Sequence, residues 1–150
     1  MCNTRKKLKI LLVEDSEDDA FFFDLALQKS GWLCDRDHVI DGGQAVDYLQ
    51  ASCKSETVPD LIFLDLKLPV LTGFEVLEWI KAEHLLPHLH VVILSGSDHQ
   101  SDIMRGRELG AADYLVKPVS PEELKKRLEA VPFVNSVHNA GLARIRNLAQ

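Results

Sequence analysis

Five short apolar runs, separated by longer amphipathic stretches, restrict most strongly how this chain can fold. Four of the runs are continuous rather than alternating, which is typical of strands buried on both faces of a parallel sheet. The second run alternates with polar residues. The runs span Leu8 to Val13, roughly Leu33 to Ile40, Leu61 to Leu64, His90 to Leu94 and Tyr114 to Val116.

The stretches between the runs carry helix signals, so a helix is expected after each strand. The signals are capping-box spacing, a proline at a first helical position, and glycines where helices should stop. They occur at Ser16 and Asp19, Thr72 and Glu75, Ser120 to Glu123, Gly31 and Gly110. The fifth helix should run from about Pro121 to Ala130. Five strand–helix pairs predict a doubly wound α/β fold with a five-stranded parallel sheet.

Length and charge indicate one compact domain with a real core. The chain has 150 residues, of which 46% are hydrophobic and 27% are charged, and a second full domain does not fit. We expect a basic extension at 1–7, the folded domain at 8–130 and a tail at 131–150. The net charge of −6, from 17 basic and 23 acidic residues, argues against nucleic acid or anionic lipid as a direct ligand.

Two further features point to the cytoplasm. No apolar stretch is long enough for a signal-peptide core or a membrane span, so no membrane insertion is expected. The three cysteines, Cys2, Cys34 and Cys53, lie far apart without a C-x-x-C pair. This pattern fits reduced thiols.

Polar residues follow four of the predicted strands. Ligand sites of open α/β sheets lie there, outside the carboxyl ends of the strands. Glu14 and Asp15 follow the first strand, Asp65 follows the third, Ser95 the fourth and Lys117 the fifth. Since these strand ends share one edge of a parallel sheet, we expect the five side chains to converge.

Three of the converging residues are carboxylates, which repel one another unless a cation lies among them. Their oxygen atoms favour Mg²⁺ over zinc, and the dense spaced acids of a calcium loop are missing. An aspartate in such a place can act as a nucleophile and carry an acyl phosphate. A lysine and a hydroxyl beside it supply the positive charge and the hydrogen bond that a transferred phosphoryl group needs.

Four local sequences around these residues resemble the receiver domains of two-component response regulators. They are Leu11-Leu12-Val13-Glu14-Asp15, Leu64-Asp65-Leu66-Lys67-Leu68-Pro69 followed by Gly73, Ile93-Leu94-Ser95-Gly96, and Tyr114-Leu115-Val116-Lys117-Pro118. In this order and with these separations, the resemblance covers residues 8 to 130. The segment from Asp65 to Pro69 and the compact length are similar to the phytochrome-associated single-domain regulators.

The resemblance implies a flavodoxin-like (βα)5 receiver fold in which Asp65 is the phosphoacceptor. It implies that Glu14 and Asp15 hold Mg²⁺ together with Asp65 and the backbone carbonyl of Lys67, and that Lys117 pairs with the phosphoryl oxygens. The side chain of Lys67 departs from the family pattern. This long cation stands two residues after the nucleophile, where it could reach the phosphoryl group or a neighbouring acid.

Family membership also implies a switch and a set of partners. Ser95 and Tyr114 would be the switch pair, and the Lys117–Pro118 peptide bond would be cis. The phosphoryl donor would be a sensor histidine kinase or a histidine phosphotransfer protein, and a downstream protein target would bind the altered face near the fourth helix. Such a receiver catalyses only its own phosphorylation and dephosphorylation. Whether the chain forms a homodimer is left open.

Two other functions compete for the same acidic edge. A small phosphohydrolase of the dehalogenase-like type also places an aspartate at a strand end, but it typically needs a second acid two residues later. Lys67 occupies that position here, and there is no room for a cap domain. A receiver-like binding module that is never phosphorylated would lack one of the acids of the cluster, or Asp65, or Lys117. All of these residues are present here.

The first predicted helix contains three consecutive phenylalanines. At about 100° per residue, Phe22 and Phe23 share one face with Ala26 and Leu27, and this face should be buried. Phe21 and Leu25 fall on the opposite, otherwise polar side. We expect Phe21 and Leu25 to help dock the phosphodonor, the alternative being that Phe21 lies against its own helix.

Overall fold

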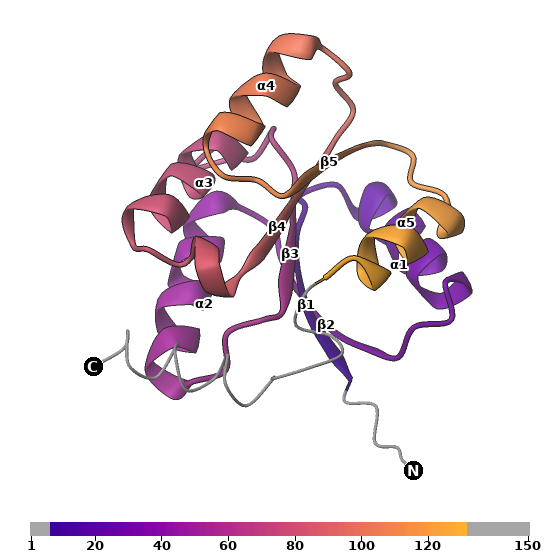
Figure 1. Ribbon diagram of the computed structural model, residues 1–150, viewed down its shortest axis with the longest axis horizontal. Coiled ribbons are helices and arrows are strands. Elements are labelled where there is room, and N and C mark those ends of the chain that lie inside the picture. The colour runs from indigo at the N-terminus through magenta and orange to yellow at the C-terminus, as the bar shows by residue number, and fades with distance from the viewer. Residues whose placement is uncertain (1–6, 132–150) are drawn as a thin grey trace.

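The computed structural model describes residues 7–131, which form three layers with a parallel sheet in the middle (Figure 1). The strand order across the sheet is β2-β1-β3-β4-β5, so the predicted doubly wound fold is confirmed. The elements are β1 (Leu8–Val13), α1 (Glu17–Lys29), β2 (Cys34–Val39), α2 (Gly42–Ser55), β3 (Leu61–Leu64), α3 (Gly73–Ala82), the 3-10 helix η1 (Leu86–His88), β4 (His90–Ser95), α4 (Gln100–Glu108), β5 (Asp113–Val116) and α5 (Pro121–Glu129).

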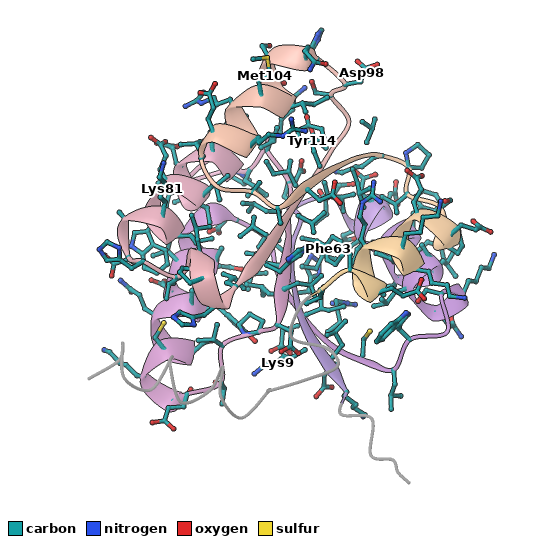
Figure 2. The ribbon with its side chains drawn as sticks, in the orientation of Figure 1. Lys9, Phe63, Lys81, Asp98, Met104 and Tyr114 are labelled. Atoms are coloured by element: carbon teal, nitrogen blue, oxygen red, sulfur yellow. The ribbon has the colours of Figure 1, made fainter. Side chains whose placement is uncertain are left out.

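Helices α1 and α5 cover one face of the sheet, and α2, α3 and α4 cover the other (Figure 1). Successive residues of a strand point to opposite faces, so each continuous apolar run contributes to two cores. Leu11 and Ile62 belong to the core under α2 and α3. Leu12 and Phe63 belong to the core under α1 and α5, and Figure 2 labels Phe63 in this core. The ring centroids of Phe63 and Phe23 lie 4.8 Å apart.

Strand β2 differs from the others because it lies at an edge of the sheet. Its residues alternate between half-buried and exposed over most of its length. Cys34 pairs with Leu8 and Val39 pairs with Val13 in the parallel register with β1. The alternating pattern of the second apolar run therefore reflects a strand that is incompletely covered.

The predicted helix boundaries are set by side-chain caps. Thr72 and Glu75 form a complete capping box at the start of α3. The Ser120 side chain caps α5, which ends at Glu129, one residue before the expected end. Gly110 follows the last turn of α4 with a φ of +105°, a conformation that favours glycine.

The predicted domain at 8–130 lies within the described residues. The expected extension at 1–7 and tail at 131–150 lie outside them, apart from Lys7 and Val131. Within residues 7–131, no helix is long and apolar enough to cross a membrane.

Candidate functional site

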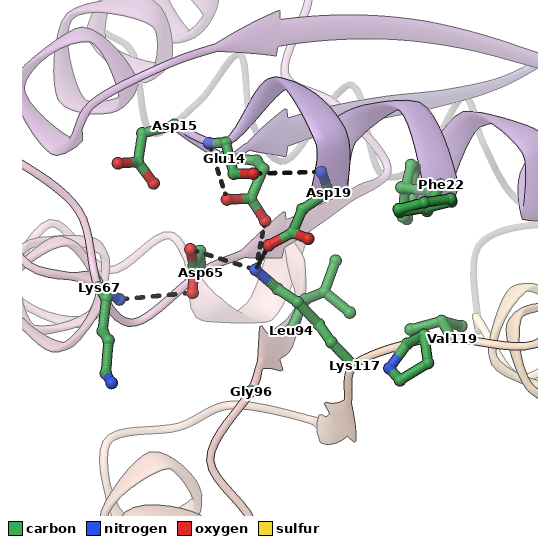
Figure 3. A pocket seen from close by; sticks show the side chains of 13 residues that line it. Glu14, Asp15, Asp19, Phe22, Asp65, Lys67, Leu94, Gly96, Lys117 and Val119 are labelled. Carbon is green, nitrogen blue, oxygen red and sulfur yellow. Dashed lines mark hydrogen bonds and ion pairs between the residues drawn. The ribbon is translucent and has the colours of Figure 1, made fainter.

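A cleft of about 570 Å³ lies at the carboxyl edge of the sheet, beyond the ends of β1, β3, β4 and β5 (Figure 3). The structure brings four of the five predicted side chains to one place, as the topology of a parallel sheet requires. The fifth, Ser95, is buried at the end of β4 and is not among the residues that line the cleft. Glu14, Asp15, Asp65, Lys67 and Lys117 all line the cleft.

Lys117 is the centre of the charged groups. Its ammonium nitrogen, Nζ, lies 2.5 Å from Oε1 of Glu14, 2.8 Å from Oδ2 of Asp19 and 3.3 Å from Oδ2 of Asp65. The lysine side chain is only 16% exposed. One cation therefore offsets three acids that come from two strands and a helix.

Three acids form a cluster that could hold a metal ion. Glu14, Asp15 and Asp65 each offer a carboxylate oxygen, and these oxygens lie within 4.8 Å of one another. Glu14 and Asp65 are buried, whereas Asp15 is exposed to solvent. A set of hard oxygen donors with one open side fits Mg²⁺, which keeps several waters and needs few protein ligands.

Burial and pairing act in opposite directions on these groups. Burial raises the pKa of the Glu14 carboxyl above its ordinary value of 4.5, the hydrogen bond from Lys117 opposes the increase, and the charge of Asp65 adds to it. Burial alone would lower the pKa of Lys117, but its hydrogen bonds to Asp19 and Glu14 outweigh burial and raise that pKa. Lys117 therefore stays positively charged in the cleft.

The backbone around Asp65 is closely packed and has little room to move. A Cβ atom on Gly73 would lie 2.2 Å from the carbonyl oxygen of Asp65, so any other residue there would force backbone atoms to move. The backbone N–H of Lys67 donates to Oδ1 of Asp65 at 3.4 Å. The Lys67 side chain is exposed and points away from Asp65 (Figure 3), so its cation does not reach the acids in this structure.

Ser95 and Tyr114 are linked through the loop between β4 and α4. Ser95 is buried, and its Oγ accepts a hydrogen bond from the backbone N–H of Ser97 at 3.1 Å. The Tyr114 hydroxyl donates to the backbone carbonyl of Ser97 at 2.8 Å. Tyr114 is half-buried where β5 faces α4 (Figure 2). Both proposed switch residues thus contact one loop residue.

A family model for the response regulator receiver domain matches residues 10–129. The chain belongs to this family. Its fold and its carboxyl-edge acids agree with that membership, and receiver domains act in two-component signalling. The Lys117–Pro118 peptide bond is cis, as the resemblance implied.

Individual relatives support the assignment. The chain is 37% identical over 124 residues to the alkaline phosphatase synthesis transcriptional regulatory protein PhoP of Bacillus subtilis, covering 82% of this chain and 48% of PhoP. It thus spans about half the length of that curated relative.

Among solved structures, the chain resembles the phosphorylated cyanobacterial phytochrome response regulator RcpA, with 34% identity, a TM-score of 0.70, and coverage of 87% of this chain and 96% of that one. It also resembles the bacteriophytochrome response regulator RtBRR, with 32% identity, a TM-score of 0.76, and coverage of 96% and 94%. The similarity to phytochrome-associated regulators was predicted from the segment Asp65 to Pro69.

Sequence reasoning missed two residues that contact the charged groups of the cleft or their backbone, Asp19 and His38. Asp19 was interpreted as a capping residue, and its backbone N–H does donate to Oγ of Ser16, but its carboxylate binds Lys117 instead of closing a capping box. His38, on β2, lies with Nε2 2.7 Å from the backbone carbonyl of Glu14. An acid in the first turn after a metal-binding strand end was the available signal for Asp19.

The predicted buried face of α1 was wrong at one position. Phe22 is 58% exposed, as is Phe21, and the two rings lie edge to face with centroids 5.8 Å apart. Phe23 is buried as predicted, and Leu25 is half-buried. Because Phe22 lies at the end of the cleft beside Val119 (Figure 3), it borders the site rather than the core.

Proposed function

We propose that Asp65 accepts a phosphoryl group from a sensor histidine kinase or a histidine phosphotransfer protein. One observation carries the proposal: a buried aspartate, two further carboxylates and a lysine meet in one open cleft. Glu14, Asp15, Asp65 and the backbone carbonyl of Lys67 would hold Mg²⁺. The phytochrome regulators among the similar structures favour a phytochrome-linked kinase as the donor.

The residues of the cleft fit the chemistry of this transfer. An oxygen of the Asp65 carboxylate forms a bond to phosphorus while the bond from phosphorus to the donor's imidazole nitrogen breaks. Lys117 is already 3.3 Å from Asp65 and neutralises charge on the transferred oxygens. Mg²⁺, when bound, supplies further neutralisation and orients those oxygens.

We further propose that phosphorylation changes the surface formed by α4, β5 and α5. The Ser95 hydroxyl turns toward the phosphoryl group, which releases Ser97 and the Tyr114 hydroxyl from their present contacts. The altered face then binds a downstream protein. The receiver acts in the cytoplasm. It turns over no external substrate, because Lys67 stands where a dehalogenase-like phosphatase needs its second acid.

The exposed phenylalanines of α1 are the proposed docking surface for the phosphodonor, together with the half-buried Leu25. Phe22 lines the cleft, Phe21 packs edge to face against it, and both rings are exposed to solvent. Replacing both Phe21 and Leu25 by alanine should slow transfer from a phosphorylated kinase at least about tenfold, since central aromatic contacts carry much of the binding energy of an interface. Transfer from acetyl phosphate should stay near the wild-type rate. Equal slowing of both reactions would indicate damage to the site instead.

Intact-protein mass spectrometry tests the phosphoacceptor directly. Acetyl phosphate with Mg²⁺ should add one phosphoryl group to the wild type, and either Asp65→Asn or chelation of Mg²⁺ by EDTA should prevent it. Asp47→Asn is a suitable control because Asp47 is an exposed acid of α2 that is not among the acids that pair with Lys117. Full modification of Asp65→Asn would rule out the assignment.

A further inference from the structure

Asp19 holds one of the contacts of Lys117 without belonging to the acidic cluster that could bind a metal. Its Oδ2 lies 2.8 Å from the Lys117 nitrogen, closer than the 3.3 Å of Asp65. Figure 3 shows the carboxylate reaching from the first turn of α1 onto the ammonium group. Asp19 is therefore a direct competitor of Asp65 for the same cation.

The competition matters because an ammonium group has three N–H donors. In the described part of the chain, Lys117 has three acceptors: Glu14, Asp19 and Asp65. A phosphoryl group on Asp65 brings new anionic oxygens that require these donors, so at least one present contact must be given up.

Of the two contacts of Lys117 with acids other than Asp65, the one with Asp19 costs less to release. Its side chain is 41% exposed, whereas that of Glu14 is 1% exposed, so water can solvate the Asp19 carboxylate after the lysine leaves. Releasing Glu14 would instead leave a buried carboxylate without its cation, which is far more costly.

We propose that Asp19 is a positioning residue that keeps Lys117 on the α1 side of the cleft and thereby slows phosphorylation of Asp65. The inference rests on the proposed function of Asp65. Asp19 acts in two ways: it occupies an N–H donor of Lys117, and its negative charge repels the incoming anion. Removing the charge should free Lys117 for the phosphoryl oxygens and make the receiver react faster.

The neighbouring residue Asp18 provides a matched control. Asp18 and Asp19 are both acids in the first turn of α1, so neutralising either one removes the same charge and the same favourable interaction with the helix dipole. Asp18 is exposed, and it is not among the acids that pair with Lys117. A difference between the two variants therefore reports on the contact with Lys117.

The test compares initial rates of phosphorylation by phosphoramidate with Mg²⁺, at fixed ionic strength, for wild type, Asp19→Asn and Asp18→Asn. Asp19→Asn should react about twofold to fivefold faster than wild type, the factor expected for removing one partly exposed ion pair. Asp18→Asn should react at nearly the wild-type rate. Binding of beryllofluoride, a phosphoryl mimic that cannot be transferred, should tighten by a similar factor in Asp19→Asn only.

The outcomes separate this inference from the proposed function. A wild type that is never phosphorylated counts against the function of Asp65. A wild type that is modified, with Asp19→Asn no faster, overturns the role of Asp19 alone. Equal acceleration by Asp18→Asn also overturns it, because net charge would then be the cause. A merely structural role of Asp19 predicts a slower variant with a lower melting temperature, which circular dichroism would show.

Discussion

Helices α1 and α4 flank the carboxyl edge of the sheet on opposite faces, yet they are attached to it very differently (Figure 1). Helix α1 is capped by Ser16 and buries four residues, namely Ala20, Phe23, Ala26 and Leu27. Of the residues of α4, only Gly106 is buried, and its N-cap residue His99 makes no side-chain cap. Helix α1 therefore holds its acidic first turn firmly beside the cleft, whereas α4 is packed loosely enough to move relative to the sheet.

The largest expected difference between the two sides is in the effect of replacing Gly73, beside Asp65, and Gly106, on α4. A Cβ on Gly73 would meet the backbone of Asp65 at 2.2 Å. A Cβ on Gly106 would meet the terminal methyl of Ile93 at 2.4 Å and would make an ordinary contact with the Tyr114 ring at 3.8 Å. Gly73→Ala should therefore lower the free energy of unfolding by about 3 kcal/mol, because backbone atoms must move. Gly106→Ala should change it by less than about 1 kcal/mol, since a side-chain rotation and the gain in helix propensity offset each other.

Urea denaturation of both variants measures this contrast. Similar losses for Gly73→Ala and Gly106→Ala would show that α4 is packed as firmly as the backbone that carries Asp65. The distinction between the two sides would then have no basis in packing.

Lys117, the cation in the cleft, and Arg105, a cation on α4, should also differ in their effect on stability, by a smaller amount. In buffer with EDTA, Lys117→Met should destabilise the protein by about 2 kcal/mol, because buried Glu14 then lies beside Asp65 without its cation. Arg105, on α4, is exposed and lies with its guanidinium carbon 4.4 Å from the centre of the Phe74 ring. Arg105→Met should cost less than about 1 kcal/mol, as expected for an exposed cation–π contact.

Thermal and urea melts of the two methionine variants provide the measurement. The Lys117 variant should lose more stability than the Arg105 variant. The reverse order would mean that the acids of the cleft are solvated well enough to need no cation.

The sheet was predictable because buried parallel strands are continuous apolar runs, and parallel strands bring their carboxyl ends to one edge. Glu14, Asp65 and Lys117 follow from that rule alone. Asp19 was not predictable, since capping spacing describes its backbone N–H and says nothing of where its carboxylate points. Periodicity likewise misplaced Phe22, because a helical face adjoining a cleft is only partly covered.

Gly106 shows the same limit of sequence reasoning on the α4 side. A glycine and many polar residues suggest a helix of low intrinsic stability. The structure gives the glycine a packing reason as well, because its missing side chain lets α4 approach Ile93 of β4. Local propensity and tertiary packing therefore both account for the glycine in α4.

Hydrogen exchange measured by mass spectrometry, with and without Mg²⁺ and beryllofluoride, tests the central claim most directly. We expect that filling the site at Asp65 changes amide exchange mainly at residues 97–109 and 113–116, where Ser97, Tyr114 and α4 are linked. The buried turns of α1, from Phe23 to Leu27, should change little. Changes confined to α1, or none in α4, would contradict a switch that holds charge on one side and moves on the other.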